Sequence, residues 1–158
     1  MQFTVIRNIE KERFKNVVKR MIGERKVIEF FDGDIEQQQY NCEILKVSVM
    51  QKVGYLIVKT NLENGWPYLE SVIESNNFHA ISIRFEKDRI SEFGVWESGK
   101  RVRFVQAIKD SRWVWFEKGE IKAWEAPEFY KEKIIKNRLP SSLLTRYLHE
   151  NEYAESIA

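Results

Sequence analysis

The sequence predicts an α+β fold, a single domain in which helices pack against a central antiparallel sheet. Apolar residues recur at helical spacing near the N-terminus, once in the middle and twice near the C-terminus. Between residues 78 and 125 they instead alternate with polar residues, which is typical of strands. The turns in this region are too short for parallel crossovers, so its strands must be antiparallel neighbours. Strands gathered in the middle with helices on either side indicate the α+β class.

The composition is typical of one globular domain covering residues 1–158. Hydrophobic residues make up 43% and aromatic residues 13%, whereas disordered chains are poor in both. The sequence has no apolar run close to the ~20 residues that span a bilayer, and its N-terminus lacks the charge pattern of a signal peptide. The single cysteine, Cys42, excludes an intramolecular disulfide and suits a reducing compartment. We therefore expect a cytoplasmic protein that does not enter a membrane.

The first half of the chain contains two expected helices and three expected strands. Residues 10–22 place their apolar side chains on one helical face, and Gly23 follows where a C-cap is expected. Pro67 suits the first turn of a second helix. The buried stripe of that helix comprises Leu69, Val72 and Ile73. The expected strands cover residues 27–31, 42–50 and 54–60.

Residues 78–125 predict a meander of about four antiparallel strands. In residues 80–86, apolar and polar side chains alternate. The same alternation in residues 101–108 assigns the side chains to two faces. One face carries Val102, Phe104 and Ile108, and the other carries Arg101, Arg103, Val105 and Ala107. Turns are expected at residues 97–100, 109–112 and 117–120.

Two helices are expected at the C-terminal end, where they would pack on the sheet. The first covers residues 126–139: Pro127 fits its first turn, and acidic and basic residues lie at the ends that the helix dipole favours. The second covers residues 140–150, with Ser141 as its N-cap. Its inward face carries Leu144, Tyr147 and Leu148.

Charge is divided into two adjacent blocks, although the net charge is only +2. Residues 7–26 carry eight basic and three acidic residues, hence +5. Residues 29–43 carry five acidic residues and no base, hence −5. Each block is either a solvated face of its element or a surface that steers a charged partner. The sequence leaves both interpretations open.

Residues of catalytic or metal-binding type are scattered, so we expect no catalytic residue, no metal site and no cofactor. The two histidines, His79 and His149, are far apart, and neither has a neighbour of metal-ligand type. A nucleophile pair of Cys42 and His79 is conceivable, but cysteine more often serves as a small buried hydrophobe. Residues 32–36 begin like a calcium loop and lack its later glycine and glutamate. We do not expect an enzyme.

The stretch RWVWFEKGEIKAWE, residues 112–125, concentrates three tryptophans around a turn. Strand periodicity places Trp113 and Trp115 on one face and Val114 and Phe116 on the other. One of these faces lies under the C-terminal helices or binds a partner, because tryptophan and arginine are common interface anchors. The neighbouring arginines are Arg84, Arg101 and Arg103. Rings among basic residues also describe a platform for single-stranded nucleic acid, although no RNA-binding signature is present.

Several segments after residue 80 form a pattern of core and turn residues. A strand with a tryptophan leads through a glycine turn to a Trp-Glu pair, and four further positions follow on the expected helices. These positions are Trp113, Gly119, Trp124-Glu125, Tyr130, Ile134, Arg138-Leu139 and Tyr147-Leu148. Together with "ISIRF" and "WESGKRVRFV" before it, the pattern in roughly residues 81–148 resembles small immunity proteins of bacterial polymorphic-toxin systems, including contact-dependent inhibition.

The resemblance implies a cytoplasmic, non-catalytic protein that binds and neutralises one cognate toxin domain. It transfers no binding residue, so the candidate surfaces come from the sequence itself. The preferred one is the acidic stretch Asp32, Asp34 and Glu36, whose Gln-rich surroundings predict an exposed loop suited to the basic groove of a nuclease. The other is the Trp/Arg sheet face of Arg101, Arg103, Trp113 and Trp115. The alternative function is a nucleic-acid-binding module that uses the basic first helix and this sheet face.

Overall fold

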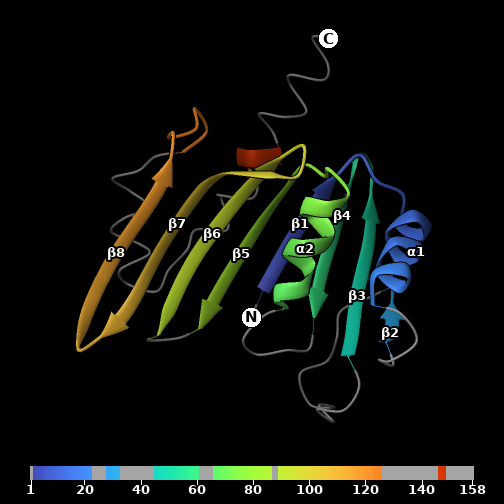
Figure 1. Ribbon diagram of the computed structural model, residues 1–158, viewed down its shortest axis with the longest axis horizontal. Coiled ribbons are helices and arrows are strands. Elements are labelled where there is room, and N and C mark those ends of the chain that lie inside the picture. Colours follow the sequence, from blue (N-terminus) through green and yellow to red (C-terminus); the bar gives the residue numbers. More distant parts are fainter. Residues whose placement is uncertain are drawn as a thin grey trace.

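Most of the described chain forms one large sheet with two helices packed on it (Figure 1). The computed structural model describes residues 2–22, 28–32, 45–60, 66–86, 89–125 and 146–148. The strands are β1 (Gln2–Arg7), β2 (Ile28–Phe31), β3 (Leu45–Lys52), β4 (Tyr55–Thr60), β5 (Ala80–Glu86), β6 (Ile90–Glu97), β7 (Lys100–Asp110) and β8 (Arg112–Gly119). The helices are α1 (Lys11–Ile22) and α2 (Pro67–Ser75), and residues 146–148 are also helical. The fold is broadly α+β, as the sequence predicts.

The sheet is mostly antiparallel, with the strand order β2-β3-β4-β1-β5-β6-β7-β8. Neighbouring strands run antiparallel except at one edge, where β2 runs parallel to β3. The predicted meander is confirmed as β5 to β8, and two of its turns fall at residues 97–100 and 109–112. The expected C-terminal helices, residues 126–139 and 140–150, lie outside the described residues except for the helical residues 146–148.

Strand β1 lies in the middle of the sheet, between β4 and β5, and has no counterpart among the expected elements. The sequence of this strand does not show the apolar pattern expected of a buried strand, because two of its buried residues, Gln2 and Thr4, are polar. Ser82 of β5 contacts both: Gln2 Nε2 donates to Ser82 Oγ at 3.1 Å, and the Thr4 and Ser82 hydroxyls lie 2.9 Å apart. Gln2 Oε1 accepts the Trp66 N–H at 2.6 Å, next to the start of α2. These hydrogen bonds allow polar side chains in the core.

Helices α1 and α2 cover one face of the sheet, which we call the helix side (Figure 1). Their apolar stripes are buried there, as helical spacing predicts: Phe14, Val17 and Val18 from α1 and Leu69, Val72 and Ile73 from α2. The strands contribute Ile6, Val47, Val49, Leu56, Val58, Ala80 and Trp96 to the same core. No helix in the described ranges is long and apolar enough to cross a membrane.

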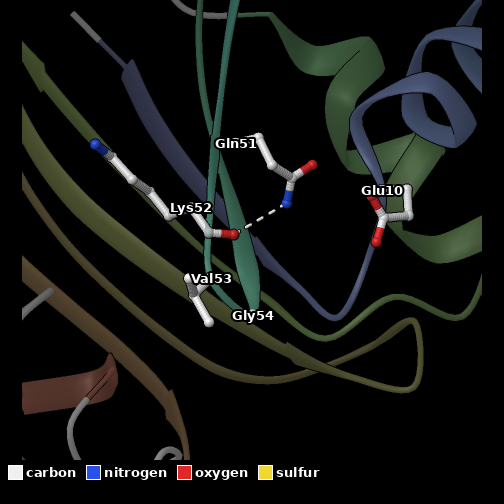
Figure 2. A pocket seen from close by; sticks show the side chains of 5 residues that line it. All are labelled: Glu10, Gln51, Lys52, Val53 and Gly54. Atoms are coloured by element: carbon white, nitrogen blue, oxygen red, sulfur yellow. Dashed lines mark hydrogen bonds between the residues drawn. The ribbon is translucent and has the colours of Figure 1, made fainter.

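The turn between β3 and β4 is tied to the start of α1 by one side chain, Gln51. Its Nε2 donates to the Lys52 carbonyl at 3.0 Å, and its Oε1 accepts the Lys11 N–H at 2.8 Å. Figure 2 shows this turn, with Val53 at its tip, beside an open hollow of about 570 Å³. Because the first N–H groups of a helix have no acceptor within it, Gln51 both caps α1 and fixes the turn.

The opposite face of the sheet, which we call the far side, has a core of its own. The Trp124 ring packs edge-on against Tyr147 with centroids 5.6 Å apart, and it lies 6.4 Å from the Phe93 ring. The buried residues of this core are Val5, Ile81, Ile83, Phe93, Val95, Val105, Ala107 and Tyr147. Tyr147 and Leu148 therefore pack inward, as expected.

A bulge between β6 and β7 changes which side of the sheet each arginine of β7 faces. Trp96 lies opposite Arg101, and Val95 lies opposite Arg103, so β7 carries one extra residue here. Trp96 belongs to the helix-side core and Val95 to the far-side core. The two arginines consequently face opposite sides, and the prediction that they share a face is wrong. Strict alternation fails at this point because a bulge shifts the register by one residue.

Trp96 marks the border between the helix-covered and uncovered parts of the helix side. Its indole is buried and lies on Gly94, where an added Cβ would come within 2.8 Å of the outer indole ring. Its Nε1 donates to Glu74 near the end of α2 at 3.2 Å. Gly94 is required here because the indole occupies the space of a side chain at that position.

Replacing Gly94 with alanine is expected to lower the free energy of unfolding by about 1–3 kcal/mol, because the methyl group overlaps the Trp96 indole in a packed core. Urea denaturation of the wild type and the variant measures this loss. In a Trp96→Phe background the smaller ring lacks the overlapping atoms, so the same alanine should be much less destabilising. Equal losses in both backgrounds would contradict the packing of the indole on Gly94.

Candidate functional site

Beyond Trp96, the described residues place no helix over the helix side of β7 and β8. Neither α1 nor α2 lies over these two strands in Figure 1. On β7 and β8 the pleat turns Ile108, Val114 and Phe116 to this side, and their exposed fractions are 40%, 52% and 50%. Large apolar side chains grouped on neighbouring strands form a patch, and exposed apolar patches mark interaction sites.

Phe104 links this apolar patch to a set of cations. Its ring lies 6.0 Å from the Phe116 ring, at an interplanar angle of 57°. The Arg101 guanidinium lies 4.4 Å from the Phe104 centroid, a cation–π contact. Lys118 is the cross-strand neighbour of Phe104. We define the open face as the apolar residues Phe104, Ile108, Val114 and Phe116 together with the exposed cations Arg101, Arg112 and Lys118.

A polar row separates the open face from α2. Arg84 Nη1 lies 3.6 Å from the Glu92 carboxylate, and Gln106 donates to the same carboxylate at 2.6 Å. Glu70 of α2 lies half-buried near this row. Its burial raises the pKa of its carboxyl, an effect that Arg101 partly offsets. The open face thus has an apolar centre and a charged border, which is the usual anatomy of a protein interface.

A hollow of about 450 Å³ lies at one end of the open face. It is lined by Glu74, Arg101, Val102, Arg103, Phe104, Lys118 and Gly119. Two cations of the open face, Arg101 and Lys118, therefore reach it together with the Phe104 ring. The Glu74 carboxylate lies in the same hollow and accepts the Trp96 N–H.

Arg103, which the sequence places on the partner-binding face, has a buried side chain. Its exposed fraction is 2%, and that of the Glu125 side chain is 1%. Arg103 Nε and Nη2 each donate to a Glu125 oxygen at 3.0 Å, and Nη2 also donates to Glu117 at 2.8 Å. Burial by itself would lower the pKa of the guanidinium, but the hydrogen bonds to Glu125 and Glu117 outweigh it and raise the pKa. We call these three residues the Arg103 cluster.

The Arg103 cluster fixes the chain where it leaves β8. Arg103 Nη1 donates to the Gly119 carbonyl at 3.1 Å. Gly119 has a φ of +89°, and an added Cβ would lie 2.0 Å from the Val102 carbonyl oxygen, so glycine is required. β8 continues to this residue, so the turn expected at residues 117–120 begins later than predicted. The chain then brings Glu125 back to Arg103.

Trp113 and Trp115 face the far side of the sheet. Both are partly buried against its core, and Trp115 Nε1 donates to Glu117 at 2.9 Å. The more exposed face of β8 is the one that carries Val114 and Phe116. The tryptophans of this strand therefore serve as core in the described structure.

The residues predicted for one Trp/Arg face are divided between the two sides of the sheet. Arg101 lies on the open face, whereas Arg103, Trp113 and Trp115 lie on the far side. The open-face residues absent from the predicted binding set are Phe104, Ile108, Val114, Phe116, Arg112 and Lys118. The sides are distinguished by cross-strand pairs that only the structure shows: Ala107 lies opposite Trp115, and a small residue opposite a large ring is typical of a packed face.

The predicted acidic surface is described only at its first residue. Asp32 is exposed, and its Oδ1 lies 2.7 Å from Lys11 Nζ of α1. This hydrogen bond lowers the pKa of Asp32 and raises the pKa of Lys11. Asp34 and Glu36 lie outside the described residues. The prediction that the three carboxylates form one surface therefore stays a prediction.

The cations of α1 contact aromatic rings and carboxylates. Lys15 and Lys19 lie 5.7 and 5.8 Å from the Phe30 centroid, and Arg13 lies 5.8 Å from that of Phe78. Together with the ion pair between Lys11 and Asp32, these contacts place much of the positive block against its own fold. Arg13, Lys19 and Arg20 are nevertheless exposed, so this part of the block forms a solvated helix face, one of its two predicted interpretations.

Of the cysteine and the two histidines, His79 has a local hydrogen-bond partner and the other two residues are not described. His79 Nδ1 accepts the Ser98 N–H at 3.3 Å, in the turn after β6. Cys42 and His149 lie outside the described residues. Within the described ranges, no three His, Cys, Asp or Glu residues are grouped as a metal site requires.

Compared with known protein families, with curated proteins and with solved structures, the chain shows no match to any of them. The open face, the hollow and the Arg103 cluster are therefore the features from which a function is inferred.

Arg103→Met is expected to lower the free energy of unfolding by about 3–5 kcal/mol, because it leaves Glu125 as a buried carboxylate without its cation. The same replacement at Arg101 should change it by less than about 1 kcal/mol, since that guanidinium is exposed. Urea denaturation of both variants measures the difference. Similar losses would contradict the assignment of the two arginines to opposite sides of the sheet.

Glu70→Gln is expected to stabilise the protein increasingly as pH rises above 4.5, the ordinary pKa of the carboxyl. Because the folded pKa is raised, the native state holds a proton that the unfolded chain releases, and wild-type stability falls as pH rises through this interval. Glutamine has no proton to release, so the variant lacks this decrease in stability. The unfolding free energies of the wild type and the variant, measured between about pH 4 and pH 7, should diverge with increasing pH and then remain parallel. A difference between the two proteins that becomes smaller as pH rises would contradict the burial of Glu70.

Proposed function

We propose that the chain is a non-catalytic immunity protein that binds and neutralises one cognate bacterial toxin domain in the cytoplasm. The resemblance of residues 81–148 to such proteins motivates the proposal, and the open face supports it by offering a surface for a protein partner. The two C-terminal helices expected from the sequence belong to the same proposal, as a cover for the far side. The protein requires no cofactor for this role.

The observation that carries the proposal is the exposure of Val114 and Phe116 on β8, the edge strand of the sheet. Fully burying a valine or phenylalanine side chain stabilises by about 1.5–3 kcal/mol. Each of these half-exposed side chains thus offers on the order of 1 kcal/mol to a partner that covers it. Aromatic and arginine side chains dominate the energy of most protein interfaces, and Phe104, Phe116 and Arg101 lie in contact here.

The open face is also held in place before any partner arrives. β7 pairs with both β6 and β8 along its length, and the Arg103 cluster fixes the end of β8 through buried hydrogen bonds. A surface that needs no ordering on binding loses less entropy. Such preorganisation suits an inhibitor that must bind its target tightly.

Nucleic-acid binding is the second candidate, and one observation favours it. The rings of Phe104 and Phe116 lie beside Arg101 and Lys118, a combination that also binds single strands by base stacking. The predicted contribution of α1 is weaker, because its cations already contact Asp32, Phe30 and Phe78. Phosphate contacts make affinity fall steeply with salt, so a wash at high ionic strength separates the two functions.

The double variant Val114→Asp/Phe116→Asp is expected to weaken toxin binding by at least ~100-fold, because it places carboxylates in the apolar centre of the interface. The matched control is Lys109→Asp, an exposed position on the far side of β7. The measurement is affinity capture from a lysate of the encoding organism at high salt, followed by co-expression of the captured domain with each variant.

Capture of one secreted protein whose domain arrests growth, with protection by the wild type and the control only, would support both the function and the surface. Full protection by the double variant would contradict the use of the open face. A captured domain that does not inhibit growth would contradict the immunity function. Recovery of nucleic acid that is lost as salt rises would favour the second candidate.

A further inference from the structure

The charges around the hollow are unevenly neutralised. Arg103 is paired with Glu117 and Glu125 inside the protein. Arg101, which lies on the Phe104 ring, and Lys118, the cross-strand neighbour of Phe104, are both exposed and both line the hollow. The positive charge that an incoming group meets there therefore comes from Arg101 and Lys118.

Glu74 gives the hollow an asymmetric charge. Its Oε1 accepts the Trp96 indole N–H at 3.2 Å, which holds the carboxylate on the α2 side. The cations lie on the β7 and β8 side, next to the Phe104–Phe116 ring pair. An anionic group is attracted to the strand side of the hollow and repelled by Glu74.

From this arrangement we infer that the open face binds a segment of its protein partner in which a carboxylate side chain stands next to an apolar one. The carboxylate enters the hollow between Arg101 and Lys118, and the apolar side chain packs on Phe104 and Phe116. The inference rests on the proposed function, since it specifies the contact chemistry of the partner. Complementary charge at such a border fixes register and speeds association.

Two other occupants fit the open face less well. A second copy of the chain would double the cations Arg101, Arg112 and Lys118 in one interface, where the exposed carboxylates beside them, Asp110 and Glu74, are fewer. A nucleic acid would find half of the apolar patch, Ile108 and Val114, without a ring for stacking. It would also meet the carboxylates of Glu74 and Glu92 beside the cations. An acidic and apolar protein segment matches both the charges and the aliphatic surface.

The experiment uses the full chain and a capped synthetic peptide, Leu-Phe-Glu-Glu, with the peptide Leu-Phe-Gln-Gln as its neutral match. Amide chemical shifts of the protein are followed during titration with each peptide. The acidic peptide is expected to bind with a Kd on the order of 1 mM and to shift the signals of Phe104, Phe116 and Lys118. The neutral peptide should bind about two- to fivefold more weakly, the range for an exposed charge pair.

Three protein variants test the position of the carboxylate. Arg101→Gln should weaken binding of the acidic peptide about two- to fivefold. Glu74→Gln should strengthen it, because glutamine keeps an acceptor for the Trp96 N–H and removes the repelling charge. Lys109→Gln, the same charge change on the far side, should leave the affinity unchanged.

Several results would overturn the inference. Equal affinities for the two peptides, or no shift on the open face at millimolar acidic peptide, would exclude the carboxylate site. Tighter binding of oligothymidylate than of the acidic peptide at the same residues would also exclude the carboxylate site, and it would identify a nucleic-acid surface. Shifts of these residues on dilution of the protein alone would identify a second copy as the occupant. Toxin capture and growth protection are independent of the peptides, so failure of the inference is distinguishable from failure of the proposed function.

Discussion

Within the described residues, two short helices pack on one face of an eight-stranded sheet, and the arrangement of that face follows from the difference in their widths. With strands about 4.8 Å apart, the sheet is roughly 34 Å wide from β2 to β8. Two helices side by side, about 10 Å each, cover roughly four strands. α1 and α2 accordingly pack over one half of the helix side, and Trp96, lying on Gly94, closes the core at the border. Beyond Trp96 the helix side carries the open face.

The bulge opposite Trp96 gives two neighbouring arginines different roles. Arg103 turns to the far side, where Glu125 and Glu117 surround its guanidinium and fix the end of β8. Arg101 turns to the helix side, where it lies on the Phe104 ring beside the hollow. Strict alternation would place both side chains on one side, either as two buried cations or as two surface cations. Because of the register shift, Arg103 stabilises the pair of strands β7 and β8, and Arg101 is exposed on the opposite side of β7.

The coarse fold could be predicted because its signals are local. The stripe Leu69, Val72 and Ile73 and the alternation in β5 specify their elements without reference to distant residues. Strand β1 could not be predicted in this way, because the burial of Gln2 depends on Ser82 and Trp66, which lie far along the chain. The faces of Arg101 and Arg103 depend on a bulge, and the residues Arg101, Val102 and Arg103 include no glycine that would indicate one. The side of the sheet that carries the candidate site also cannot be predicted, since the two sides are distinguished by cross-strand pairs such as Ala107 and Trp115.

The proposed function requires that the open face contacts a protein partner in the cell. In-cell photocrosslinking tests it most directly, with p-benzoylphenylalanine introduced in turn in place of Phe116, Asp32 and Lys109. We expect one discrete protein adduct from position 116, where the half-exposed ring lies against Phe104 on the open face, and none from position 109 on the far side. An adduct from position 32 alone would contradict this expectation and assign the partner to the acidic surface instead.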